Sequence, residues 1–180
     1  MNASSKRTLA VLISIVAILG MLSAAGTPEL GLHEFWTLNL KGEEVTQEIF
    51  SDSKLNMINV WATYCSPCLY EMPALAELHE EYASQGVKII GLVTDIDFSN
   101  QESFSKSIQT ANYVVRETGA DYVHMIPSED LYNLRLKDVQ VVPETFFVDS
   151  KGTIVGETHY GARDKAAWKS IIDSTLALLE

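Results

Sequence analysis

Residues 57–94 carry the pattern that most restricts the fold, because two buried strands flank one amphipathic helix there. The run MINVWAT, residues 57–63, is mostly apolar and rich in β-formers, as expected for a buried central strand. Apolar residues then recur every three or four positions from 69 to 82, which predicts a helix. GVKIIGLVT, residues 86–94, reads as a second buried strand opened by a glycine. A strand, helix and strand in this order form a right-handed parallel crossover.

The rest of the chain supplies the elements around this unit. In chain order these are a hairpin or two short strands over 35–46, a polar helix over 99–119, a short helix from Ser128 to Arg135, an antiparallel hairpin of strands 145–149 and 153–158, and an amphipathic helix over 163–179. Pro73 lies inside the first predicted helix and is expected to kink or break it. The order predicts an α/β domain, with a central mixed sheet flanked by helices and an N-terminal hairpin extension.

The charge of the chain argues against one group of partners. The formal net charge is -11 at pH 7 and the pI is near 4.7. Such a chain repels nucleic acid and anionic lipid headgroups, and no run of Lys and Arg offsets the acidic excess. A length of 180 residues suits one domain with a full core. We therefore expect a single domain that does not bind nucleic acid.

The N-terminus has the pattern of an export signal. Lys6 and Arg7 precede an uncharged apolar stretch, and small residues suited to cleavage extend to Ala25. Residues 8–26 are 19 uncharged positions, which is also long enough for a retained membrane anchor. Either outcome exports the rest of the chain, because the positive flank comes first and stays inside. The chain then divides into a signal peptide or anchor over 1–26, a linker over 27–34 and a domain over 35–180.

The two cysteines, Cys65 and Cys68, allow three interpretations. As a structural staple, a bridge across two residues closes too short a loop to stabilise the fold much. As half of a zinc site, the pair lacks a second Cys-x-x-Cys. The histidines do not stand at metal-ligand spacing and are expected on the surface or in loops, at positions 33, 79, 124 and 159. No metal site is therefore predicted, and the third interpretation is a redox centre.

The local pattern favours the redox centre. Cys65 lies where the predicted strand gives way to the predicted helix, so free backbone N–H groups and the helix dipole can stabilise its thiolate. In motifs of this kind the cysteine pKa falls from about 8.5 to about 3.5–7.5. Cys68 follows one helical turn later, within reach of a mixed disulfide on Cys65. Pro67 suits the first helical turn, where its missing N–H costs little.

Two segments carry a resemblance to a known family. NVWATYCSPCLYEMP, residues 59–73, resembles the active-site segment of thioredoxin-like thiol-disulfide oxidoreductases of the exported TlpA/ResA-like branch. VQVVPETFFVDSKGTIVG, residues 139–156, is similar to the segment that carries that family's cis-proline before a hairpin. The resemblance covers most of residues 35–180. It implies a thioredoxin-like fold and disulfide exchange with other exported proteins, without a cofactor.

The resemblance also implies catalytic roles. Cys65 would be the attacking cysteine and Cys68 the buried resolving cysteine. Glu71 matches an acidic residue of this branch and would move protons to or from Cys68, whereas outside the family it would simply be solvated. Asn59 occupies the position of the buried acid of general thioredoxins, which shifts the acid-base role toward Glu71.

Substrate contacts are implied around a second proline. Pro143 would be the cis-proline, and the backbone of Val142 would pair with a substrate strand. Trp61 would pack beneath the site, and we count it with Pro67 among the substrate-binding residues. Glu144 departs from the small hydroxyl residue common after this proline and is expected either to alter substrate docking or to point to water.

The resemblance makes the leading hypothesis an exported protein-disulfide reductase that acts as a monomer. Its implied substrates are apocytochrome c, methionine sulfoxide reductases or other cell-envelope proteins, and a membrane donor of the thiol-transporting type would supply electrons. Ser66 and Pro67 do not determine the direction, so a disulfide-forming oxidase stays open. A peroxidase is disfavoured, because the pattern around the pair is not that of a peroxiredoxin. A copper chaperone that uses both thiolates and a histidine is the alternative of a different class.

Overall fold

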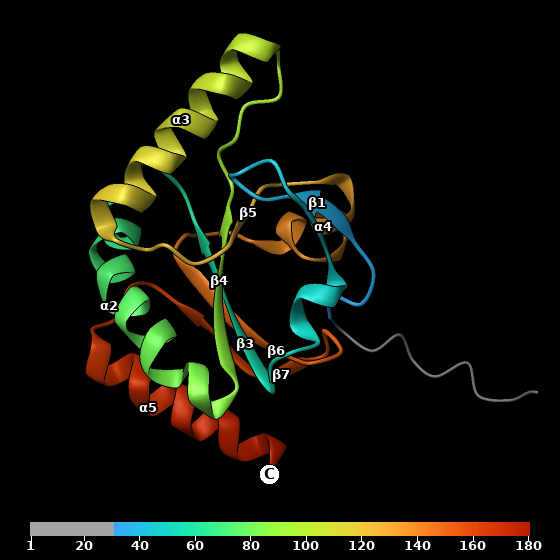
Figure 1. Ribbon diagram of the computed structural model, residues 1–180. Helices are drawn as coiled ribbons and strands as arrows, with labels where there is room; N and C mark the ends of the chain where they lie inside the picture. The colour runs from blue at the N-terminus through green and yellow to red at the C-terminus, as the bar shows by residue number, and fades with distance from the viewer. Residues whose placement is uncertain (1–30) are drawn as a thin grey trace, which may run out of the picture.

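A mixed sheet lies at the centre of the computed structural model, which describes residues 31–180 (Figure 1). Its strands are β5 (His124–Met125), β4 (Val87–Val93), β3 (Leu55–Trp61), β6 (Glu144–Asp149) and β7 (Ile154–Tyr160), in that spatial order. β4 runs parallel to β3 and β5, whereas β6 runs antiparallel to β3 and β7. The predicted mixed sheet is therefore confirmed.

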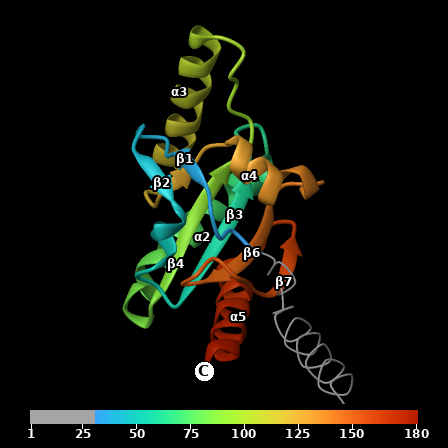
Figure 2. The same ribbon diagram turned by 90° about the vertical axis from the view of Figure 1, so that its right-hand side faces the viewer.

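Helices and short strands cover the two faces of this sheet. Figure 1 shows α2 (Ser66–Tyr82), α3 (Gln101–Thr118) and α5 (Lys165–Leu176) on one side. The other side carries β1 (Trp36–Leu38), β2 (Glu44–Thr46) and α4 (Glu129–Leu134), which face the viewer in Figure 2. Short 3-10 turns complete the chain over Gln47–Phe50, Ala83–Gln85, Leu136–Asp138 and Ala177–Leu179.

The alternation of side chains along β3 divides the core into two parts. Every residue of β3 is buried, so each strand face must pack against another layer. Met57 and Trp61 point into the core shared with α2, α3 and α5, and Ile58 and Val60 point into the core beneath β1 and α4. Asn59 has the same parity as Met57 and Trp61, so this polar residue faces α2.

The helix that follows β3 runs from Ser66 to Tyr82, so of the kink or break expected at Pro73, the break is not found. Proline removes one backbone donor from a helix interior, which usually weakens it. Here Met72 and Leu75, on either side of the proline, are completely buried in the core while Pro73 itself is exposed. Tertiary packing of that apolar face holds the helix together across the proline.

Side-chain caps begin the remaining helices. Asn100, Ser128 and Asp164 each accept a hydrogen bond from the backbone N–H three residues later, at the starts of α3, α4 and α5. Gly119 ends α3 with φ at 68°, a left-handed conformation that favours glycine. The short helix predicted to start at Ser128 and the predicted end of the preceding helix at Gly119 are both confirmed.

The N-terminal hairpin of β1 and β2 is antiparallel, as predicted. Of the predicted linker over 27–34, residues 31–34 are described, and they lie against the turn between β6 and β7. Leu32 is buried there, and its N–H donates to the carbonyl oxygen of Gly152 at 2.8 Å. The predicted signal or anchor over 1–26 lies outside the described residues. Within 31–180, no helix has the length and apolar character needed to cross a bilayer.

Candidate functional site

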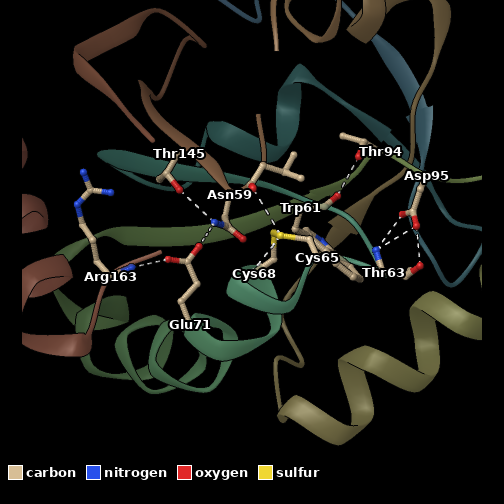
Figure 3. Close-up of a disulfide and its surroundings, with 11 residues drawn as sticks. Asn59, Trp61, Thr63, Cys65, Cys68, Glu71, Thr94, Asp95, Thr145 and Arg163 are labelled. Carbon is tan, nitrogen blue, oxygen red and sulfur yellow. Dashed lines mark hydrogen bonds between the residues drawn. A yellow bond between two sulfur atoms is a disulfide. The ribbon is translucent and has the colours of Figure 1, made fainter. Parts of the chain in front are cut away.

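Cys65 and Cys68 are joined by a disulfide at the start of α2 (Figure 3). Cys65 is the N-cap of this helix, and the backbone N–H of Cys68 donates to its Sγ at 3.2 Å. Cys65 keeps 6% of its surface exposed, whereas Cys68 is fully buried. Of the two cysteines, only Cys65 therefore keeps any contact with solvent. The same N–H group and the helix dipole are placed to stabilise a Cys65 thiolate.

The segment before the disulfide is anchored to the end of the neighbouring strand. The N–H of Thr63 donates to both carboxylate oxygens of Asp95 at 3.0 Å, and its hydroxyl also donates to this carboxylate. The backbone N–H of Thr94 donates to the carbonyl oxygen of Trp61 at 2.9 Å. Because β3 and β4 are parallel, their carboxyl ends meet at one edge of the sheet, and β4 thereby fixes the approach to Cys65.

The second segment that carries the family resemblance, residues 139–156, reaches the disulfide through its cis-proline loop. The peptide bond between Val142 and Pro143 is cis, as the resemblance implied. The carbonyl oxygen of Val142 stands 3.5 Å from the Sγ of Cys65, although the two residues are 77 positions apart. The loop that ends at this proline therefore borders Cys65, the less buried cysteine of the site.

Glu71 is completely buried, so the expectation that it is simply solvated is wrong. Its Oε1 accepts a hydrogen bond from Asn59 Nδ2 at 2.9 Å. Its Oε2 accepts from the backbone N–H of Arg163 at 3.0 Å and from Trp168 Nε1 at 2.9 Å. Burial raises the pKa of Glu71 above its ordinary value, although these hydrogen bonds partly offset the shift. A buried carboxyl group thus lies on the same helix as Cys68, three residues later.

Asn59 connects this carboxyl group to the sheet. Its Nδ2 also donates to Thr145 Oγ1 at 3.0 Å, across the register pair between β3 and β6. Figure 3 shows Asn59 between Glu71 and Thr145, close to the disulfide. Sequence reasoning missed Thr145, Arg163 and Trp168 as members of this site. The only signal available for Trp168 was its place on an apolar helix face, which indicates core packing alone.

Trp61 packs in the same core as the two cysteines and is tied to His124. Its Nε1–H donates to His124 Nδ1 at 3.0 Å, and His124 Nε2–H donates to the carbonyl oxygen of Ala120 at 2.8 Å. His124 is a buried residue of β5, so its expected place on the surface or in a loop is wrong. Both ring nitrogens are used, and burial lowers the pKa of His124 to about 4.

We expect His124 to stay neutral in the folded protein at all pH values well above 4. The unfolded chain takes up this proton near the ordinary pKa of about 6.5, so the free energy of unfolding falls as the pH drops from there toward 4. The loss reaches roughly 3 kcal/mol for this group. NMR titration of the His124 Cε1 proton tests this, with the urea-unfolded chain as the control. A midpoint near 6.5 in the folded protein would contradict it.

Glu144 follows the cis-proline and is buried, so it does not point to water. Its carboxylate forms an ion pair with the guanidinium of Arg135, which also lies over the Phe146 ring at 4.8 Å from the centroid. Burial raises the pKa of Glu144, and the charge of Arg135 opposes that shift. This buried ion pair thereby connects the segment before the cis-proline loop, at Arg135, with the strand that follows it, at Glu144.

Metal-ligating residues are not grouped elsewhere in the described part of the chain. Across residues 31–180, no three His, Cys, Asp or Glu side chains come together in an arrangement that could hold a metal ion. The site consists of a disulfide, a buried carboxyl group and the carbonyl oxygen before a cis-proline.

Comparison with known proteins finds the AhpC/TSA family model over residues 28–156. Thioredoxin-like protein YneN of Bacillus subtilis is 26% identical over 151 residues, which cover 81% of this chain and 82% of that protein. Thiol:disulfide interchange protein DsbE of Pasteurella multocida is 34% identical over 121 residues, covering 67% of this chain and 59% of that protein. Thiol-disulfide oxidoreductase ResA of Bacillus thuringiensis is 26% identical over 123 residues, with coverage of 68% and 64%.

Solved structures agree on the fold. The thiol:disulfide interchange protein of Chlorobium tepidum superposes with a TM-score of 0.67 at 19% identity, covering 84% of this chain and 99% of that one. The chain spans less than two thirds of the DsbE and ResA relatives, but most of YneN. The thioredoxin-like fold and the resemblance to ResA-like proteins are thus confirmed. With the family model matching well over half of its length, the chain belongs to the AhpC/TSA family.

Proposed function

We propose that the protein is an exported thiol-disulfide oxidoreductase that reduces disulfides of cell-envelope proteins through Cys65 and Cys68. One observation carries the proposal. Cys65 keeps a small exposed fraction, caps a 17-residue helix and accepts an N–H hydrogen bond from Cys68 at its sulfur, while Cys68 is completely buried. This asymmetry suits one attacking and one resolving cysteine. The names of the ResA and DsbE relatives support the same chemistry.

The reaction moves two electrons from the protein to its substrate. The Cys65 thiolate attacks one sulfur of a substrate disulfide, so a mixed disulfide forms and the other substrate sulfur leaves as a thiolate that takes up a proton. The Cys68 thiol then loses its proton and attacks the Cys65 sulfur. The second substrate thiol leaves, and the protein is left with the Cys65–Cys68 disulfide. A membrane donor of the thiol-transporting type would restore the dithiol, so no cofactor is required.

Glu71 is the proposed proton acceptor for Cys68. The two residues share a face of α2, and the burial of Glu71 shifts its protonation toward neutral pH. Around the attacking sulfur, the Val142 backbone would pair with an extended substrate segment beside Pro143. Pro67 is exposed next to the disulfide and would contact the substrate, whereas Trp61 is buried and would support the site from below.

Export and partners belong to the same proposal. The predicted signal or anchor over residues 1–26 would deliver the domain to the outside of the membrane. One of the similar solved structures is described as a secreted disulfide oxidoreductase of Mycobacterium tuberculosis, which supports that setting. Proposed substrates are apocytochrome c, in the course of cytochrome c maturation, and oxidised methionine sulfoxide reductases.

A reductase requires a low reduction potential for the Cys65–Cys68 pair. We expect a value at or below about -250 mV, toward the thioredoxin end of the range. The measurement equilibrates the purified full chain with thiol buffers of known potential and counts reduced cysteines by alkylation. The Cys68→Ala variant is the control, because it cannot form the intramolecular bond.

A potential near -120 mV, where DsbA lies, would instead mean that the protein forms disulfides. Titration of the reduced protein with copper(I) separates the remaining alternative. A tight stoichiometric complex that is lost in Cys65→Ser, together with no disulfide reduction, would favour a copper chaperone. Weak copper binding with rapid disulfide reduction would support the oxidoreductase.

A further inference from the structure

An apolar groove opens on the face of the molecule that carries β1 and α4. Its volume is about 900 Å³, which lies within the range of pockets that hold sizeable ligands. It is lined by β1, by the end of the loop before α3 together with the first turn of α3, and by residues 126–132 at the start of α4. We call it the aromatic groove, because Trp36, Phe98, Phe104 and Tyr132 line it.

The aromatic side chains of this groove are unusually exposed. Trp36 is 49% exposed, Phe98 56% and Tyr132 57%. With Tyr64 and Val141, which line the adjoining hollow, they make up half of the ten large hydrophobic residues that are exposed in residues 31–180. Such a concentration of apolar surface marks an interaction site rather than the scattered exposure of an ordinary surface.

A second hollow lies between the groove and residues next to the disulfide. Its volume is about 290 Å³, and it shares Pro127 and Tyr132 with the groove as lining residues. This hollow is also lined by Tyr64, which precedes Cys65, and by Val142. The carbonyl oxygen of Val142 is the atom that lies 3.5 Å from the Cys65 sulfur. The two hollows therefore meet at Pro127 and Tyr132, and the second is lined by the residue whose carbonyl oxygen stands beside the Cys65 sulfur.

Among residues 31–180, acidic residues are the only charged side chains that line the two hollows. Glu129 and Asp130 border the groove, and no Lys or Arg lines either hollow. Asp130 accepts a hydrogen bond from the backbone N–H of Trp36. Glu129 has no ion-pair partner among residues 31–180. A basic side chain that entered the groove would meet an unneutralised carboxylate, and the acidic chain as a whole would attract it.

We propose that the aromatic groove binds the segment of a substrate polypeptide that flanks its disulfide, and that it selects segments with aromatic and basic side chains. The proposal rests on the proposed disulfide exchange at Cys65. The cis-proline loop would hold the residues next to the substrate cysteine, and the groove would bind side chains farther along the same extended segment. Thiol-disulfide exchange at Cys65 does not itself distinguish one accessible disulfide from another. The groove would supply this distinction by binding the sequence that flanks the disulfide.

The test uses peptides with one internal disulfide and identical sequences except for the flanking segment. One flank is aromatic and basic, a second aromatic and acidic, and a third small, polar and basic. Bis(2-hydroxyethyl) disulfide serves as a substrate too small to reach the groove. We expect kcat/KM for the aromatic and basic peptide to exceed that for the other two by about tenfold, mostly through KM.

Substitutions in the groove should remove this preference. Phe98→Ser and Tyr132→Ser should each lower kcat/KM for the aromatic and basic peptide several-fold, without changing the rate on the small disulfide. Tyr113→Ser, at a residue that is 55% exposed and lines neither hollow, is the matched control and should change neither rate. Glu129→Gln should reduce the discrimination against the acidic flank and its dependence on salt.

A binding measurement makes the result independent of catalysis. Peptides with serine in place of cysteine are titrated into the oxidised full chain, and NMR shifts of the Trp36 indole N–H report occupancy. Binding without reduction of any disulfide would refute the proposed function and leave the groove as a peptide site. Equal reduction of all three peptides without Trp36 shifts would overturn the groove alone. A dimer in sedimentation that Phe98→Ser and Tyr132→Ser disrupt would also overturn it, because a second copy would then cover the groove.

Discussion

Cys65→Ser is expected to reduce disulfide exchange to the rate of the reducing agent alone. Cys65 is the only cysteine of the pair that keeps any exposed surface, and it lies at the N-cap of α2 with the Cys68 N–H directed at its sulfur. A serine hydroxyl at the same cap keeps the helix start but is not ionised at neutral pH. The measurement is turnover of a peptide disulfide with thiol reductant in excess, together with the free energy of unfolding of the fully reduced proteins.

Cys68→Ala is the matched variant and should fail differently. The attack by Cys65 needs no group on Cys68 other than its backbone N–H, which alanine retains. The variant should therefore release one substrate thiol per protein molecule and then stop as a mixed disulfide on Cys65. Mass spectrometry under non-reducing conditions detects this adduct. If Cys68→Ala turned over and Cys65→Ser accumulated the adduct, the two roles would be reversed.

Glu71→Gln is expected to slow the second step, the resolution of the mixed disulfide, by about 10²-fold. Glutamine fills the same buried space and can still accept one hydrogen bond from Trp168 or Arg163, but it cannot take a proton from Cys68. The attack of Cys65 on the substrate should change little, because its thiolate is stabilised by the N-terminus of α2 and not by Glu71. Single-turnover release of the two substrate thiols separates the two steps.

The pH dependence of that step gives a readout that a structural role would not produce. Burial raises the pKa of Glu71, so its carboxylate forms only as the pH rises through this elevated value. In the wild type the resolution rate should rise through that inflection. In Glu71→Gln the rise should move to the ordinary range of a thiol, near 8.5. Glu80→Gln, an exposed position of the same helix, is the control and should leave the profile unchanged.

The linked effect on stability has a definite sign. The unfolded Glu71 carboxyl ionises at its ordinary pKa and the folded one at a higher pKa. Its contribution to stability is therefore complete at pH values below the unfolded pKa and declines as the pH rises through the folded pKa. Glu71→Gln should lack this decline when urea unfolding is measured across the acid range. In the kinetic test, a Glu71→Gln protein whose resolution rate kept the wild-type inflection with pH would refute the role of Glu71 as proton acceptor for Cys68.

Much of the fold could be predicted because its signals are local. The buried run of β3, the spacing of apolar residues on α2 and the cap at Ser128 are each contained within a few turns or one strand. The expected break at Pro73 failed for the opposite reason. A local rule about proline was outweighed by the burial of Met72 and Leu75, which depends on the whole domain.

What the sequence determined by itself is the chemistry of the reacting pair. One short stretch of sequence contains everything needed to predict this pair. It includes the spacing of Cys65 and Cys68, the strand before them and the helix after them. Helix capping and helix geometry then bring the two sulfurs together without help from distant parts of the chain.

Only the tertiary structure decided the surroundings of that pair. Trp168 reaches Glu71 across 97 positions, and Val142 reaches Cys65 across 77, because the sheet register and the docking of α5 bring them there. The burial that raises the pKa of Glu71 and makes His124 neutral comes from the same packing. The aromatic groove likewise joins β1, the 94–100 loop and α4. No local sequence pattern predicts such contacts, because each depends on how distant elements pack against one another in the folded domain.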